Sequence, residues 1–232
     1  MIAPPVVDGV VKVSALGELE YIDQNQSSPI APGSRTTYLQ AHIDLSASID
    51  LSTNGIPYQW SPLGSGVLPP PSLPVLETTS LPSLPSIPTL PLPILPIFSG
   101  TFNGEGHTIE GWVVNDASAQ VAGFFGVVSG TIKNLGVRGT VHGGSTVGGL
   151  VGSAQTGSSI TFSYSAASVS GNRFIGGLVG GQLPGSTIED TYVTGDVTGT
   201  LDHSSSPGGL VSSDSVVQAH CSSHAGEKRA LA

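Results

Sequence analysis

The residues best suited to acid–base chemistry are four carboxylates late in the chain: Glu189, Asp190, Asp196 and Asp202. A glycosidase needs two carboxyl groups that face one substrate across roughly 5–10 Å. Glu189 and Asp190 are adjacent, and adjacent residues of a strand point to opposite faces. We therefore expect solvated surface carboxylates. The alternative is a carbohydrate-active β-helix enzyme, a polysaccharide lyase or hydrolase, and it requires at least two of the four to converge.

Metal-ligating residue types gather near the C-terminus, where His220, Cys221 and His224 have a spacing that could hold a metal ion. Zinc sites require three or four ligands in a defined geometry. These residues lie in a tail without further repeats, so adventitious binding is the most that we predict. No GxSxG, HExxH, P-loop or EF-hand pattern occurs in the sequence. The sequence therefore nominates no catalytic, cofactor-binding or metal-binding residue.

The charge balance argues against nucleic acid and anionic membranes as partners. The net charge is −9, and the seven Lys and Arg residues are scattered along the chain. Binding to phosphate backbones needs clustered positive charge that releases counterions. Cys221 is the single cysteine, which excludes an intramolecular disulfide framework.

Neither a targeting segment nor a membrane span is predicted. The first residues, MIAPPVVDGV, lack the basic and continuous apolar regions of a signal peptide. No run of 18 residues is apolar without an interrupting proline. We expect a piece of a larger protein, or one whose leader is missing.

The elements that must position these side chains show a repeat of 28 residues. Three blocks open with Ile and close with Val nine residues later: Ile132–Val141, Ile160–Val169 and Ile188–Val197. A fixed period of this length marks an architecture in which one unit cannot bury its own apolar face. Short strands and many glycines favour one coil of a β-solenoid over helical repeats. Ile132, Ile160 and Ile188 are then expected in one inward column.

A glycine-rich element accompanies the blocks. It reads GGLVG at Gly148–Gly152 and at Gly176–Gly180, GGLVS at Gly208–Ser212, and AGFFG at Ala122–Gly126. We expect its Leu and Val residues to stack on equivalent sites of successive coils. Its glycines are expected to allow sharp corners and positive φ.

Two further columns follow from the same period. Tyr164 and Tyr192 align, and the sequence leaves open whether they stack inward or outward. A hydroxyl column (Thr131, Ser159 and Thr187) raises ice binding as a second alternative function. The neighbouring column is mixed (Lys133, Thr161 and Glu189), so we interpret the hydroxyls as supporting their own stack.

The N-terminal part contains two predicted elements. The segment Ser14–Asn25 favours a short helix with Ser14 as N-cap and an apolar stripe of Leu16, Leu19 and Ile22. In TTYLQAHIDL, apolar residues alternate with polar ones from Leu39 to Leu45, which predicts a strand with one buried face. IDLS recurs at Ile49–Ser52 as a second strand or a loop.

Proline is concentrated between Pro62 and Pro96, which hold eleven of the eighteen prolines. An aliphatic residue recurs about every third position there, so a polyproline II helix would align Leu81, Leu84 and Ile87. We predict a semi-rigid insertion. A ligand for a proline-recognising module, or a strut on the side of the domain, is the alternative.

Several motifs together resemble the GLUG-motif proteins of bacterial and archaeal surfaces. They are GTFNGEGHTIEGW, AGFFG, GTIKNLGVRGTV and GGLVG, with a lead-in of ALGELEYI, YLQAHIDLS and YQWSPLGS. The resemblance covers Val11–Ser65 and Phe98–Val211, and the long Pro/Leu insertion and the C-terminal tail depart from it. It implies a right-handed parallel β-helix, an adhesin-like role and an extracellular or cell-surface location. It also places His107 in a structural turn of the family, as a turn or packing residue.

These observations predict an all-β, right-handed parallel β-helix with a short N-terminal capping helix and a Pro-rich insertion. The expected divisions are a cap with the first strands (1–66), the insertion (67–97), solenoid repeats (98–211) and a disordered tail (212–232). The expected function is a non-catalytic adhesion or stalk segment of a secreted or cell-surface protein. A glycan or a surface protein is the expected partner, without cofactor or metal, and the oligomeric state stays open.

Overall fold

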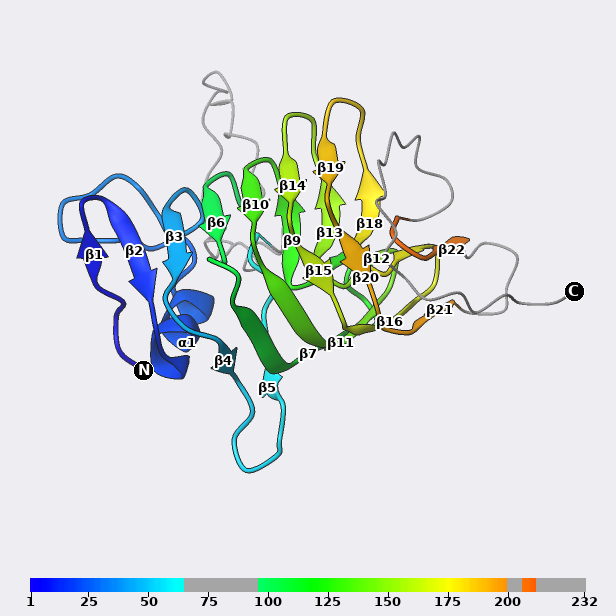
Figure 1. The fold of residues 1–232 in the computed structure, drawn as a ribbon, viewed down its shortest axis with the longest axis horizontal. Coiled ribbons are helices and arrows are strands. Elements are labelled where there is room, and N and C mark those ends of the chain that lie inside the picture. Colours follow the sequence, from blue (N-terminus) through cyan, green and yellow to red (C-terminus); the bar gives the residue numbers. More distant parts are fainter. Residues whose placement is uncertain (65–95, 200–205, 212–232) are drawn as a thin grey trace, which may run out of the picture.

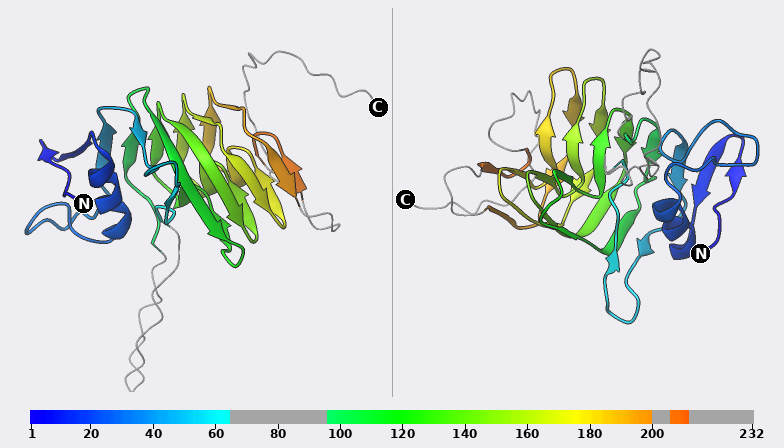
Figure 2. Two further views of the ribbon diagram at one scale, coloured as in Figure 1. Left: turned by 90° about the horizontal axis from the view of Figure 1, so that it is seen from below. Right: turned by 180° about the vertical axis from the view of Figure 1, so that it is seen from behind.

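The chain is an all-β parallel solenoid (Figure 1). The computed structural model describes residues 1–64, 96–199 and 206–211 of the 232-residue chain. Strands of successive coils lie side by side from the N-terminal to the C-terminal end (Figure 2). Within the described ranges one helix is present, α1 (Leu16–Gln24), and no helix there is long and apolar enough to cross a membrane. The predicted fold class is confirmed, whereas nearly all of the Pro-rich insertion and the whole predicted tail lie outside these ranges.

The first sheet carries the isoleucine column. Its neighbours pair in parallel, except for the antiparallel β1 and β2. Ile132 pairs with Ile160 and Ile160 with Ile188, and at most 2% of each side chain is exposed. The predicted inward column is therefore confirmed. In spatial order the strands are β1 (Val6–Val7), β2 (Val10–Val13), β3 (His42–Leu45), β6 (Thr101–Asn103), β10 (Thr131–Lys133), β14 (Ser159–Thr161) and β19 (Thr187–Glu189).

The second sheet is built around two long strands, β7 and β11. In the later coils each long strand is replaced by two short ones, and Val141, Val169 and Val197 align across them. Two lead-in strands pair with the other edge of β7. The strands are β4 (Ile49–Asp50), β5 (Tyr58–Gln59), β7 (Thr108–Asp116), β11 (Gly136–Gly143), β15 (Tyr164–Ser165), β16 (Ser168–Gly171), β20 (Tyr192–Val193) and β21 (Val197–Gly199).

Two smaller parallel sheets complete the coils. The GGLV elements form the corner between these sheets, where Val151 pairs with Val179 and Leu150 donates its N–H to the carbonyl of Leu178. The predicted stacking of these residues is confirmed. One sheet contains β8 (Val121–Ala122), β12 (Thr146–Gly148), β17 (Phe174–Gly176) and β22 (Ser206–Gly208), and the other β9 (Phe125–Val128), β13 (Val151–Ala154) and β18 (Val179–Gln182).

The corner glycines act through their small size. A β-carbon at Gly148 would collide with the carbonyl oxygen of Val151, and one at Gly176 with that of Val179. Neither glycine has positive φ. The expectation of positive φ for these glycines is therefore wrong, because what requires glycine at the corners is the close approach of neighbouring backbone. Positive φ occurs instead in the tight turns, as at Gly106 and Gly157.

An aromatic cluster fills the interior of the first coils. The Trp60 ring stacks on Phe124 at a centroid distance of 4.5 Å, and Trp112 contacts Phe124 edge-on at 5.2 Å. Phe125 continues the cluster through further edge or tilted contacts with Phe98, Phe102 and Phe124. The Trp60 indole N–H donates to the carbonyl of Phe124 at 2.8 Å. These contacts fix the lead-in segment that carries Trp60 against the solenoid wall.

The N-terminal helix differs slightly from its prediction. Leu19 and Ile22 are fully buried, as expected for the core-facing stripe. The N-cap is Ala15 and not Ser14, because the Glu18 carboxylate accepts hydrogen bonds from the backbone N–H groups of both Ser14 and Ala15. That interaction satisfies donors at the helix start without a capping hydroxyl.

The strand predicted over residues 36–45 is shorter than expected. Leu39, Ala41, Ile43 and Leu45 are all buried, so the alternating pattern identified the buried residues correctly. Only His42–Leu45 forms a strand (β3), because Gln40 and Ala41 donate their N–H groups to the carbonyls of Thr37 and Tyr38 in a turn. Ile49–Asp50 forms the second strand, β4.

Candidate functional site

The structure describes three of the four candidate carboxylates. Glu189 ends β19 in the first sheet, Asp190 follows in a turn with φ of 49°, and Asp196 precedes β21 in the second sheet. All three are exposed. No hydrogen bond joins any two of them within the described part of the chain, and Asp202 lies outside it. The three thus sit at successive positions around the last described coil: at the end of β19, in the turn after it, and just before β21.

Of the candidate histidines, the structure describes His107 but not His220 or His224. His107 lies between the turn at Glu105–Gly106 and β7, and its N–H donates to the carbonyl of Gly104. His220, Cys221 and His224 lie outside the described residues. Among residues 1–64, 96–199 and 206–211, no group of three His, Cys, Asp or Glu side chains could hold a metal ion.

The hydroxyl column has the predicted register. Thr131 pairs with Ser159, and Ser159 with Thr187, on the outer face of the first sheet. The parallel column next to it contains Lys133 and Glu189. This face therefore mixes an ammonium and a carboxylate with its hydroxyl groups.

A serine–histidine pair, which the sequence did not indicate, lies on the second sheet. His142 Nδ1 and Ser170 Oγ are 2.9 Å apart. The Ser170 hydroxyl also lies 3.3 Å from the carbonyl oxygen of Val141, and the Thr198 hydroxyl repeats this contact one coil later with Val169. The repetition identifies the pair as part of a polar stack that follows the coil period.

The strongest exposed feature is a row that we call the tyrosine platform, formed by Tyr164 and Tyr192. Their rings stack at a centroid distance of 4.9 Å with an angle of 7° between their planes. They pair in register on β15 and β20, and 53% of Tyr192 is exposed. The question that the sequence left open is settled, because the pair faces outward.

The tyrosine platform is held rigidly from below. The Tyr164 hydroxyl lies 2.8 Å from the Thr108 hydroxyl, two coils earlier in the same row. Gly136 occupies the rung between them, and a β-carbon there would overlap the Tyr164 ring. Glycine thus makes the space in which the ring lies, and the hydroxyl contact fixes its direction.

A third exposed aromatic residue lies in the turn that leads into the platform. Phe162 has φ of 48° and is 63% exposed. The equivalent residues of the neighbouring coils, Asn134 and Asp190, also have positive φ. Asn and Asp tolerate this conformation well, whereas a bulky side chain there is an uncommon and costly choice. Phe162 thus adds an exposed apolar side chain two residues before Tyr164.

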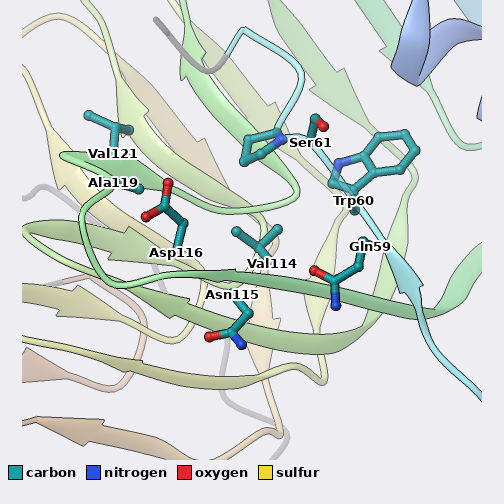
Figure 3. Close-up of a pocket in the computed structure, with 9 residues that line it drawn as sticks. Gln59, Trp60, Ser61, Val114, Asn115, Asp116, Ala119 and Val121 are labelled. Carbon is teal, nitrogen blue, oxygen red and sulfur yellow. The ribbon is translucent and has the colours of Figure 1, made fainter.

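A separate groove of about 350 Å³ opens beside the C-terminal end of β7 (Figure 3). Val114 and Asp116 point from the strand towards the segment that bears Trp60 and Ser61, whereas Asn115 points away (Figure 3). The strand β7 reaches from this groove to Thr108 beneath the tyrosine platform, a separation of roughly 20 Å at the usual rise of a strand. The lining consists of Gln59, Trp60, Ser61, Pro62, Val114, Asn115, Asp116, Ala119 and Val121.

Hydrogen bonds from α1 and the residues after it hold one wall of this groove. Asp23 accepts from the Tyr58 hydroxyl at 2.9 Å and from the Ser61 N–H at 3.1 Å. The Gln26 side chain donates to the carbonyl of Ser61 and accepts from the N–H of Gly64. Burial raises the pKa of Asp23 to about 6, although these hydrogen bonds act in the opposite direction. Burial, with the nearby charge of Asp23, raises the pKa of Tyr58 to about 12, so its hydroxyl remains a donor.

Asp116 is the acidic group of the groove. Its Oδ1 accepts from the Ser118 hydroxyl at 2.6 Å and from the Ser118 N–H at 2.9 Å. These hydrogen bonds lower the pKa of Asp116, so its carboxylate is ionised at neutral pH. Its second oxygen makes no hydrogen bond or ion pair within residues 1–64, 96–199 and 206–211.

Comparison with known proteins supports the fold. No family model and no curated protein sequence matches the chain. The structure is similar to the crystal structure of a "putative immunoglobulin A1 protease" from Bacteroides ovatus, with a TM-score of 0.52 and 16% identity. The match covers 90% of this chain and 64% of that one, so this chain spans less than two thirds of its length. At this level of identity the likeness shows a shared fold.

Proposed function

We propose that this chain is a non-catalytic solenoid segment of a secreted or cell-surface protein, and that it binds a glycan on the tyrosine platform. The observation that carries this proposal is the outward, stacked pair of Tyr164 and Tyr192, in which the Tyr164 hydroxyl is anchored by Thr108. Aromatic rings offer a flat apolar face to the C–H groups of a sugar ring, and their hydroxyl groups reach its polar edge. The motif resemblance to GLUG-motif surface proteins supports an adhesive role.

The rigidity of the platform favours binding over a purely mechanical role. A ring that is already held in place loses little rotamer freedom when a ligand docks, so more of the contact energy remains for affinity. Tyr164 is held by Gly136 beneath it and by the Thr108 hydroxyl. An exposed aromatic pair that is prearranged in this way is suited to bind a flat ligand face.

The test is a glycan array followed by calorimetric titration of the best ligand. We expect Tyr192→Ala to weaken binding by about 5- to 12-fold, because loss of one aromatic contact removes roughly 1–1.5 kcal/mol. Tyr192→Phe retains the ring and is expected to keep most of the affinity. Ile56→Ala is the matched control, since Ile56 is 70% exposed on a different part of the surface.

Two results would count against the proposal. If no glycan binds anywhere on the array, a spacer or stalk role replaces adhesion. If a glycan binds equally well to the wild type and to Tyr192→Ala, the ligand site lies elsewhere on the molecule. Circular dichroism of each variant establishes that the comparison is made between folded proteins.

A further inference from the structure

We infer that the groove beside the C-terminal end of β7 binds an alkylammonium group, such as the side chain of a lysine presented by a partner protein. This site is independent of the tyrosine platform, because the two lie at opposite ends of β7. The inference rests on the chemistry of the walls, the charge of Asp116 and the way in which the groove is held open.

The walls of the groove suit a hydrocarbon stem. Pro62 and Val121 supply partly exposed aliphatic surface, whereas Val114 and Trp60 are only 3% and 4% exposed. The four-carbon stem of lysine commonly lies along apolar surface while its charged end reaches a polar group. The volume of about 350 Å³ lies at the small end of the range for ligand pockets, which favours a single side chain over a large ligand.

Asp116 supplies the charge that selects an ammonium group. Ser118 fixes the direction of its carboxylate by binding one oxygen, and the other oxygen has no partner among the described residues. No lysine or arginine lines the groove, so no cation of the lining competes for that oxygen. The net charge of −9 adds a long-range attraction for a cationic partner. A phosphate or carboxylate ligand would meet repulsion at the same place.

The groove is prearranged, because hydrogen bonds from outside it hold the opposite wall. Asp23 and Gln26 bind the backbone of Ser61, and the backbone N–H of Trp60 donates to the carbonyl of Val113 on β7. On the strand side, β7 is fixed by its pairing with β11 up to Asp116. A ligand that enters therefore does not have to order either wall.

The experiment is an NMR titration of the full 232-residue chain with Nα-acetyl-lysine N-methylamide. The matched probe is the norleucine analogue, which has the same stem without the charge. We expect saturable shifts of the amide signals of Asp116, Ser118 and Val121 with a millimolar dissociation constant, and binding of norleucine weaker by about fivefold or more. The affinity for lysine is expected to fall as salt is added.

Four variants separate the groove from general attraction to an acidic surface. Asp116→Asn keeps the acceptor for Ser118 and removes the charge, so it should lose the preference for lysine over norleucine. Asp50→Asn is the matched control, because Asp50 accepts the same kind of hydrogen bond from the Ser52 N–H but does not line the groove. Ala119→Leu fills the groove and should abolish binding of both probes, whereas Tyr192→Ala should change nothing.

Several outcomes would overturn the inference. It fails if lysine gives no saturable shifts at tens of millimolar, or if norleucine binds as well as lysine. It also fails if Asp50→Asn weakens lysine binding as much as Asp116→Asn does, or if a neutral monosaccharide proves the better ligand of the groove. The titration of Tyr192→Ala decides separately whether the platform is involved.

Discussion

Asp23 shows how a single buried carboxylate makes stability depend on pH. Its pKa is about 6 in the folded chain and 3.8 in a model peptide, because burial disfavours the charged form. Between these two values the folded state binds more protons than the unfolded state, so stability falls as pH rises. The loss is complete above about pH 6 and amounts to roughly 2–3 kcal/mol.

We therefore predict that Asp23→Asn removes a downward slope in stability between about pH 4 and pH 6. An asparagine can still accept from the Ser61 N–H and can donate to the Tyr58 hydroxyl oxygen, so the fold of the groove wall is retained. The free energy of unfolding of both proteins, measured by urea titration across this range, gives the difference. Taking the difference between the two proteins cancels the pH dependence that other groups contribute to stability. One such group is Asp44: its burial would raise its pKa, but its interactions with Lys12 and His42 outweigh that effect and lower the pKa. A difference that does not change with pH would contradict the prediction.

At the scale of residues, the sequence predicted which side chains align but not where the platform or the groove would form. The 28-residue period placed Tyr164 beside Tyr192 without deciding their direction. Both tyrosines follow a turn, where alternation of inward and outward positions is interrupted, so the period carries no directional signal. The Gly136 opposite Tyr164 is visible as a departure from the tyrosine column, and it could have indicated a ring lying over that rung.

At the scale of elements, the glycines divide into two classes with different physical roles. Gly148 sits where neighbouring backbone leaves no room for a β-carbon, whereas Gly106 has φ of 83° and open space around it. We predict that Gly148→Ala costs about 3 kcal/mol through overpacking. Gly106→Ala should cost only about 1 kcal/mol through backbone strain.

Chemical denaturation of the two alanine variants tests this division. The free energies of unfolding should differ by about 2 kcal/mol in the stated order. Equal losses would mean that the corner backbone can move apart, and that the GGLV glycines are not limited by space. The slope of the denaturation curve serves as a control, since an unchanged slope shows that both variants unfold from the same compact state.

One element was missed although its signal is in the sequence. The segment VVDGVV forms a hairpin, in which β1 and β2 pair antiparallel around Asp8–Gly9. Both turn residues have positive φ, which is the geometry that Asp-Gly favours between two apolar runs. By contrast, the turn at residues 37–41 could not be read from TTYLQAHIDL, because its alternating pattern fits a longer strand equally well. Its backbone is set by contacts with distant segments, such as the hydrogen bonds from Ser99 and Gly100 to the carbonyl of Leu39.

At the scale of the whole molecule, the N-terminal helix closes one end of the stacked core. Leu19 and Ile22 of α1 are fully buried and belong to the same apolar cluster as the first coils. Figure 1 shows α1 beside β3 and β4 at this end of the solenoid. Uncovered solenoid ends expose apolar side chains and strand edges that favour association.

We predict that Leu19→Asp displaces α1 and lowers stability by about 3–5 kcal/mol, because it buries an unpaired charge. The exposed end should also make the protein associate, which sedimentation velocity at several concentrations detects. Gln24→Asp adds the same charge at an exposed position of the same helix and is expected to remain monodisperse to the same degree as the wild type. Association of both variants alike would show that the added charge, and not the uncovered end, is responsible.

The groove is also a feature of the whole molecule. It could not be predicted from the repeat pattern of the sequence. One wall comes from Gln59–Pro62 and the other from Val114–Val121, and the two meet through the pairing of β5 with β7. That pairing depends on Trp60 entering the aromatic cluster and on Asp23 holding Tyr58, contacts between parts far apart in the chain. A repeat period describes only the regular coils, so it carries no information on what the irregular lead-in places against them.

The in-register stacking of Tyr164 on Tyr192 has a consequence for evolution. The later coils share the 28-residue register, so duplication of the 28 residues from Ile160 to Thr187 would append one more tyrosine ring to the same row. If the tyrosine platform binds a glycan as proposed above, the number of ring contacts with that glycan would increase by one with each added coil. Under that proposal, the strength of multivalent binding would follow the number of repeats. Gain or loss of one repeat in the gene would then change the avidity in a single event.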